Sequence, residues 1–297
     1  MWGIFKKVFI ANSLAMYVDS IYAAPQEKYG VAILVAVLFF PFQLYADFSA
    51  YSDMAIGVSK FLGFDVGINF NHPFLSKSCG ELWKRWHISL SLWLKDYIYI
   101  PLGGSRVSTP RIYLNLIITF LVSGIWHGAA WTFVIWGLLH GLFLCFGRLL
   151  KPVNEKLPDW LRIVITFCLF SFAAIFFRAA TVNDGFIIMK KILYAPIEFI
   201  KMFPVLRADI GVKDAIKTLF SMNTSTIRIK WMFFTSFYLL CFIVIDICTA
   251  KKSGLEIIRS KPAAVRWALY YAVIIILIFS ILDNTAQMNA DFIYLRF

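Results

Sequence analysis

The sequence predicts an all-α, polytopic membrane protein. Of the 297 residues, 60% are hydrophobic and only 15% are charged, a balance outside the range of soluble globular domains. The hydrophobic residues fall into runs close to the ~20 residues that a helix needs to cross a bilayer. Each run must be helical, because nothing in the hydrocarbon could satisfy an open backbone. We therefore expect one integral membrane domain over residues 1–297, with the lipid bilayer as its first partner.

The positive charge of the chain does not predict a nucleic-acid partner. The formal net charge is +12, which would suggest nucleic acid in a soluble protein. Here the basic residues lie mainly in links between apolar runs, notably 148–162 and 249–266, where membrane orientation and anionic headgroups account for them. The same rule places both links in the cytoplasm. The basic segment 178–230 would then face outward, so the orientation stays open.

The sequence lacks the usual patterns of metal sites, redox sites and serine nucleophiles. The five cysteines form no C-x-x-C pair, and four of them lie in apolar stretches, as is typical of packing residues. No Gly-x-Ser-x-Gly elbow occurs. We expect no bound metal or cofactor.

The N-terminal part of the chain predicts two helices. Residues 1–24 have the outline of a signal peptide, but its apolar middle is interrupted by polar residues, Asn12, Ser13, Tyr17 and Asp19. We expect this segment to remain as a helix at the membrane edge. A strongly hydrophobic run over 31–46 follows and leads directly into the polar segment D-F-S-A-Y-S-D-M-A-I-G at 47–57.

Carboxylates are predicted at membrane depth in this second helix. Gln43, Asp47 and Tyr51 recur every four residues and therefore share one helix face, and Asp53 follows shortly after. A carboxylate at that depth normally faces a polar interior. It then marks a pathway or makes a structural hydrogen bond, and the sequence leaves both interpretations open.

Residues 63–111 are too polar to span the membrane simply, and they predict one amphipathic helix that lies at the interface or dips into the protein. Ser78-Cys-Gly-Glu81 has the form of a capping box, which places the helix start at about Cys79. Large apolar residues then recur at steps of three and four, namely Trp83, Trp86, Leu90, Trp93 and Tyr97. This helix would carry Arg85 and His87 and end at the turn over 101–104. Taken alone, His87 is expected to be an interfacial histidine held by a neighbour.

The remaining chain predicts further spans joined by basic links. The expected spans are 112–127, 131–146, 161–177, 231–248 and 267–282. Between them, residues 178–230 contain nine lysines and arginines and predict one or two interfacial helices rather than a soluble domain.

Two of the four histidines lie in the apolar tract S-G-I-W-H-G-A-A-W-T-F-V-I-W-G-L-L-H-G at 123–141. An imidazole without hydrogen-bond partners in hydrocarbon costs several kcal/mol, so His127 must face a cavity or find a partner. The glycines that bracket the two histidines also fit close helix packing, which alone could explain the pattern. His140 would lie on another face of a continuous helix than His127. His127 is therefore the first candidate for chemistry.

Taken together, three segments resemble the membrane-bound O-acyltransferase family. They are residues 47–57, R-W-H-I-S-L-S-L-W-L-K-D-Y-I-Y-I-P-L-G-G at 85–104 and W-H-G-A-A-W at 126–131. The ending D-F-I-Y-L-R-F at 291–297 is similar to the close of such proteins. The likeness is greatest to the bacterial branch that O-acetylates alginate and other exopolysaccharides. It implies a bundle of many helices, with interfacial or re-entrant helices, around a central tunnel.

The resemblance also implies roles for individual residues. His127 matches the histidine of the W-H-G motif, taken as essential for catalysis, and His87 matches the family's second active-site histidine. The matching residues expected to support the reaction chamber without reacting are Asp47, Tyr51, Asp53, Arg85, Trp126 and Trp131.

There are departures from the family pattern. Ala50 stands where the family usually has glycine, and Ser105 stands where asparagine is common. The opening segment W-G-I-F-K-K-V-F-I-A-N looks like one that lies inside a full-length member, so we expect several N-terminal helices to be missing.

The resemblance implies transfer of an acyl group from a cytoplasmic thioester to a hydroxyl of an exported polysaccharide or of a periplasmic partner. The expected donor is acetyl-CoA or another thioester. The resemblance also implies a periplasmic acetyltransferase partner and a place in the bacterial inner membrane. A positioned base must take the proton of the attacking hydroxyl, and histidine suits this because its unperturbed pKa is about 6.5. His127 would be that base, and His87, or a hydroxyl or amide nearby, would orient the donor or stabilise the developing oxyanion.

Three alternatives remain. D-alanyl transfer toward teichoic acid would use the thioester of a small acidic carrier protein. A transporter or channel would use Asp47, Asp53 and the histidines to relay protons or bind a solute. An inactive truncated product would show neither activity.

Overall fold

The computed structural model describes residues 1–221, 229–251 and 254–283, so the expected closing motif at 291–297 lies outside the described residues. Within these ranges the chain is helical and no strand is present. Its elements are α1 (Trp2–Phe5), η1 (Lys6–Ala11), α2 (Asn12–Tyr22), η2 (Pro25–Glu27), α3 (Gly30–Phe61), η3 (Pro73–Leu75), α4 (Cys79–Arg85), α5 (Ile88–Leu94), η4 (Lys95–Tyr99), α6 (Thr109–His127), α7 (Trp131–Leu149), α8 (Lys151–Asn154), α9 (Asp159–Arg178), α10 (Val182–Leu219), α11 (Ile229–Thr249), α12 (Gly254–Arg259) and α13 (Ala263–Asp283).

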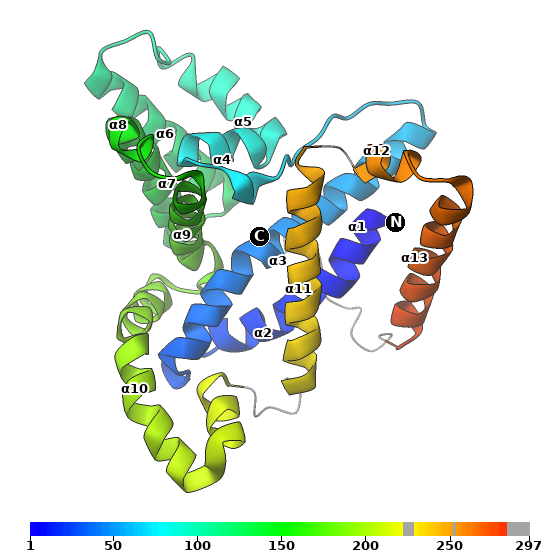
Figure 1. The fold of residues 1–297 in the computed structure, drawn as a ribbon. Helices are drawn as coiled ribbons and strands as arrows, with labels where there is room; N and C mark the ends of the chain where they lie inside the picture. Colours follow the sequence, from blue (N-terminus) through cyan, green and yellow to red (C-terminus); the bar gives the residue numbers. More distant parts are fainter. Residues whose placement is uncertain (222–228, 252–253, 284–297) are drawn as a thin grey trace.

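The helix α3 is the centre of the fold (Figure 1). It is 32 residues long, and 67% of its most hydrophobic window is buried, the largest share among the candidate spans. It packs against α1, η1 and α2 on one side and against α9 and α10 on others. The predicted hydrophobic run at 31–46 and the polar segment at 47–57 are therefore one continuous, largely buried helix.

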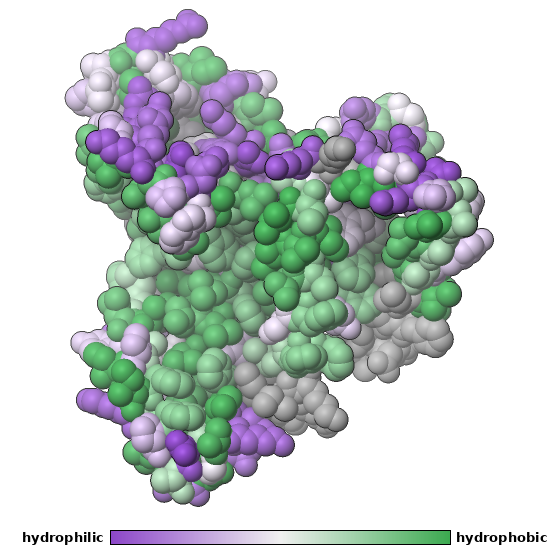
Figure 2. All heavy atoms as spheres, viewed as in Figure 1, coloured by the Kyte–Doolittle hydropathy of each residue, from purple (hydrophilic) through white to green (hydrophobic). Residues whose placement is uncertain are grey.

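The protein is a multi-pass membrane protein, as the composition predicts. Five of the described helices are long and apolar enough to cross a bilayer, namely α3, α6, α7, α9 and the 232–249 part of α11. Figure 2 shows a broad hydrophobic band between two ends where hydrophilic residues gather. The last predicted span, 267–282, coincides with α13.

The helices α6 and α7 form a close antiparallel pair, and glycines at their crossing let the two backbones approach each other. A Cβ atom added to Gly124 would lie 2.4 Å from the carbonyl oxygen of Phe133, and one added to Gly137 would lie 2.3 Å from that of Phe120. Backbone atoms cannot move aside as a flexible side chain can. The packing role predicted for these glycines is therefore confirmed.

The prediction of a single amphipathic helix from about Cys79 to the turn at 101–104 is wrong. Its start is confirmed, because the Ser78 hydroxyl accepts a hydrogen bond from the Glu81 amide at 3.2 Å. The helix breaks at His87, however, giving α4 before it and α5 with the π-helical η4 after it. The reason for this break lies in contacts from a distant segment, which also define the site.

The predicted interfacial helices at 178–230 correspond to α10. Two helical stretches meet within it at Gly211, where φ is 79°, a left-handed value that glycine adopts without steric cost. The first stretch packs against α3 and α9 and closes one end of the molecule (Figure 1).

Candidate functional site

His127 is the last residue of α6, where the helix meets the short link to α7. Its Nδ1 lies 2.7 Å from the carbonyl oxygen of Ser123, one turn earlier. A carbonyl can only accept a hydrogen bond, so Nδ1 carries a proton, and in the neutral imidazole Nε2 then carries the lone pair. The main chain thus selects the tautomer whose Nε2 can accept a proton.

Aromatic rings from three helices surround the His127 imidazole. Trp126 on α6, Trp136 on α7 and Phe177 on α9 have ring centroids 4.9, 4.8 and 5.4 Å from it, all edge to face. His127 itself is half-buried, and Trp126 is 54% exposed. The imidazole therefore lies at the edge of the packed core, against a wall that fixes its plane.

His87 lies at the break between α4 and α5 in a left-handed conformation, with φ 42° and ψ 57°. A side chain at this backbone geometry costs roughly 1 kcal/mol, so surrounding contacts must hold it. The Phe48 ring of α3 packs edge-on against the imidazole, with centroids 4.7 Å apart. Trp126 lies next to both histidines, 6.5 Å from His87. The structure thus brings His87 and His127 together around one indole ring.

Burial controls the charge of His87. It lowers the pKa of this imidazole to about 4, and the nearby His127 adds a smaller effect in the same direction. His87 is therefore neutral near pH 7, and it can donate one hydrogen bond while accepting another.

The segment over 69–72 holds the backbone around His87. The Asn71 amide donates to the Arg85 carbonyl at 2.9 Å, and the Ile88 amide donates to the Asn69 carbonyl at 3.0 Å. The Asn69 side chain accepts from the Ser89 amide and hydroxyl. These bonds replace helical bonds on both sides of His87 and explain the break. The roles of Asn69 and Asn71 were not predicted, because the residues that they bond near His87 lie too far along the chain to form a local sequence pattern.

Asp47 and Asp53 are both paired with lysines at the beginning of the chain. Lys7 donates to Asp47 at 2.7 Å, and Lys6 lies 3.0 Å from Asp53 and donates to the Ser49 hydroxyl. The predicted polar interior is thus a set of ion pairs between η1 and α3. The two lysines were not predicted as these partners, because in the sequence they fit the outline of a signal peptide.

The other predicted supporting residues are spread around the site. Tyr51 is 55% exposed although it shares a helix face with buried Asp47, because α3 leaves the core near that point. Trp131, at the start of α7, is 75% exposed. Arg85 forms an ion pair with Glu81 at 2.8 Å and donates to the Asn71 carbonyl. Arg85 therefore supports the 69–72 contact rather than the histidines directly.

His127 and His140 lie close together although they belong to different helices. The predicted spans 112–127 and 131–146 separate them correctly, with His127 on α6 and His140 on α7, so the face comparison that assumed one continuous helix does not apply. Both imidazoles contact the ring of Trp136, at 4.8 and 4.9 Å. His140 is 2% exposed and is enclosed by aromatic rings, as expected of a packing residue.

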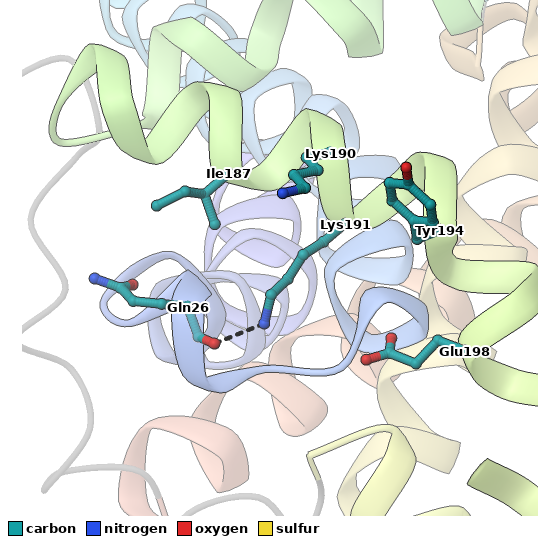
Figure 3. Close-up of a pocket in the computed structure, with 6 residues that line it drawn as sticks. All are labelled: Gln26, Ile187, Lys190, Lys191, Tyr194 and Glu198. Atoms are coloured by element: carbon teal, nitrogen blue, oxygen red, sulfur yellow. Dashed lines mark hydrogen bonds between the residues drawn. The ribbon is translucent and has the colours of Figure 1, made fainter. Parts of the chain in front are cut away.

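A separate pocket of about 310 Å³ lies between α10 and the turn that precedes α3 (Figure 3). Its polar groups join these elements: Lys191 donates to the carbonyls of Gln26 and Lys28, and the Glu198 carboxylate accepts from the Gly30 amide at the N-terminus of α3. Neither His87 nor His127 lines it. In the described ranges, no group of three His, Cys, Asp or Glu side chains could hold a metal ion.

The burial of His87 predicts an acid-dependent loss of stability. The unfolded chain binds a proton near pH 6.5 and the folded protein only near pH 4, so stability falls as pH drops through this window. The effect is on the order of 3 kcal/mol. We expect the melting temperature of the wild-type protein to fall more between pH 6.5 and 4 than that of a His87→Gln variant. Equal losses in both proteins would contradict this prediction.

The fold and the site define a multi-pass membrane protein with two histidines gathered at the edge of its helix core. The sequence profile of the membrane-bound O-acyltransferase family matches residues 1–182. The chain belongs to this family.

The chain is also similar to individual members of this family. The chain is 34% identical to a peptidoglycan O-acetyltransferase of Helicobacter pylori, over 99% of this chain and 55% of that protein. It is 49% identical to a probable alginate O-acetylase AlgI of Azotobacter vinelandii over 62% of this chain and 37% of that one. A teichoic acid D-alanyltransferase of Bacillus subtilis is 36% identical over 42% of this chain and 35% of its own length. The chain thus spans about half the length, or less, of these relatives.

Proposed function

We propose that this protein is part of a membrane O-acetyltransferase that moves an acetyl group from a cytoplasmic thioester to a hydroxyl of an exported polysaccharide. The observation that supports this most is the Nδ1 contact of His127 with the Ser123 carbonyl. It puts the proton of the neutral imidazole on Nδ1 and the lone pair on Nε2, the arrangement that a general base requires.

In this reaction the acceptor hydroxyl oxygen attacks the thioester carbonyl carbon while Nε2 of His127 takes the hydroxyl proton. Collapse of the tetrahedral intermediate breaks the C–S bond, and the leaving sulfur receives the proton from His127. Neutral His87 would donate a hydrogen bond to the carbonyl oxygen as it gains charge. No acyl-serine is needed on this route.

The donor and the acceptor lie on opposite sides of the membrane in this proposal. Acetyl-CoA is the proposed donor, because it is a cytoplasmic thioester. An exported polysaccharide or peptidoglycan is the proposed acceptor, as the names of the two O-acetylating relatives suggest. We place the protein in the inner membrane, with a periplasmic acetyltransferase as partner and a tunnel between the two faces that reaches His127.

A second candidate is D-alanyl transfer toward teichoic acid. The similarity to the Bacillus subtilis D-alanyltransferase favours it, although that similarity covers 42% of this chain. The two functions differ in the thioester used, since D-alanyl transfer needs a carrier protein.

The test is to measure ester-linked acetyl and D-alanine in the secreted polysaccharide, peptidoglycan and teichoic acid of cells with and without the protein. Proton NMR separates the two esters. We expect acetyl esters to appear only in cells that express the protein. D-alanyl esters alone would favour the second candidate, and solute flux that persists without His127 would favour a transporter.

A further inference from the structure

Asp246 on α11 joins three separate parts of the chain through one carboxylate oxygen. The Tyr45 hydroxyl of α3 donates to its Oδ1 at 2.9 Å, and Nδ1 of His72 lies 2.9 Å from the same oxygen. The side chains of His72 and Asp246 are only 20% and 15% exposed. A carboxylate this far from water and shared by two donors fixes the relative positions of the elements that carry them.

Both donors to Asp246 belong to segments that contact the chain next to His87. His72 follows Asn71, whose amide is bonded to the Arg85 carbonyl two residues before His87. His72 is itself left-handed, with φ 47°, so its backbone also depends on surrounding contacts. A loss of the His72 contact would therefore free the segment that imposes the break at His87.

Tyr45 supports the same segment from the other side. Its ring lies 5.7 Å from that of Phe70 and 6.2 Å from that of Trp86, the residue before His87. One turn further along α3, Phe48 contacts both Phe70 and the His87 imidazole. A change in the position of α3 relative to α11 would therefore be passed to His87 through these tilted and edge-to-face ring contacts.

Asp246 also lies close to a partly buried ion pair, formed by Lys6 and Asp53. Burial lowers the pKa of the Lys6 ammonium, while Asp53 and, more weakly, Asp246 act in the opposite direction. Lys6 itself is paired with Asp53. Asp246 is therefore close to this ion pair, while its hydrogen bonds go to Tyr45 and His72.

We propose that Asp246 is a positioning residue for His87: it holds Tyr45 and His72 together and so keeps the left-handed turn at His87 against α3 and Trp126. This role rests on the proposed acetyl transfer for its effect on rate. Its effect on the geometry of His87 can be measured without any activity.

The test compares Asp246→Asn with wild type by residue-resolved labelling of histidines. Diethylpyrocarbonate reacts with neutral, accessible imidazoles, and mass spectrometry of peptides reports each histidine separately. We expect His87 to react at least fivefold faster in the variant. His140, buried in the α7 core, is the internal control and is expected to keep its slow rate.

A matched variant, Asp214→Asn on α10, removes an exposed aspartate that pairs with Lys217. We expect it to label like wild type. In a parallel acetyl-transfer assay, Asp246→Asn is expected to lower kcat about tenfold and leave the KM for acetyl-CoA within twofold of wild type.

Unchanged labelling of His87 in Asp246→Asn would overturn the proposal. Faster labelling of His87 and His140 together would also overturn it, because Asp246 would then hold the fold as a whole. If wild type transfers no acetyl group, the proposed function fails, and the labelling contrast between His87 and His140 still decides the geometric role of Asp246.

Discussion

Replacing His127 with alanine is expected to lower acetyl transfer by at least ~100-fold, the lower end of what a positioned general base contributes. The loss should appear in kcat, since the base acts in the transition state and adds little to donor binding. The measurement is the initial rate of acetyl transfer from radiolabelled acetyl-CoA, with protein levels in the membrane matched between variants.

A His127→Gln variant separates chemistry from structure. The glutamine amide can still donate to the Ser123 carbonyl, but it cannot accept a proton at pH 7. We expect this variant to keep the melting temperature of wild type and to remain as inactive as His127→Ala. Substantial activity in His127→Gln would remove His127 from the proton transfer.

The second large effect is expected at the crossing of α6 and α7. A Gly137→Ala substitution puts a Cβ atom 2.3 Å from the Phe120 carbonyl oxygen, and neither backbone can yield without separating the helices. We expect a loss of about 3 kcal/mol, the upper end of the usual cost of overpacking. Thermal unfolding in detergent, followed by size-exclusion chromatography, measures it. Because His127 ends α6 and Trp136 lies on α7, we also expect activity to fall.

The same substitution at Gly147 is the matched control. Gly147 lies on α7 as well, but a Cβ atom there meets nothing within 4 Å. Alanine is a better helix former than glycine by about 1 kcal/mol, so Gly147→Ala is expected to stabilise the protein slightly. Equal destabilisation by both substitutions would show that the crossing is not closely packed.

The parts of the molecule that could be predicted are those determined by local sequence. The hydrophobic runs predict the membrane helices because burial in lipid acts on each run separately. The capping box predicts the start of α4, since its donor and acceptor are three residues apart. The W-H-G motif made His127 the first catalytic candidate through the family resemblance, and that role stays a prediction.

The break at His87 could not be predicted, because the local sequence conceals it. Trp83, Trp86 and Leu90 keep a helical spacing through the break, and no glycine or proline interrupts them. The bonds that open the helix come from Asn69 and Asn71. The ion pairs of Lys6 and Lys7 were missed for the same reason, because their carboxylate partners, Asp53 and Asp47, lie 47 and 40 residues further along the chain.

The hydrogen-bond acceptor that orients His127 is the main-chain carbonyl of Ser123, which has a consequence for the evolution of such a protein. Side chains at position 123 can vary without removing the carbonyl, whereas a histidine oriented by an aspartate loses its orientation with one substitution. The side chain at position 123 can therefore change while the proposed base keeps its tautomer. This robustness fits the occurrence of acetyl- and D-alanyltransferases among the relatives of one chain.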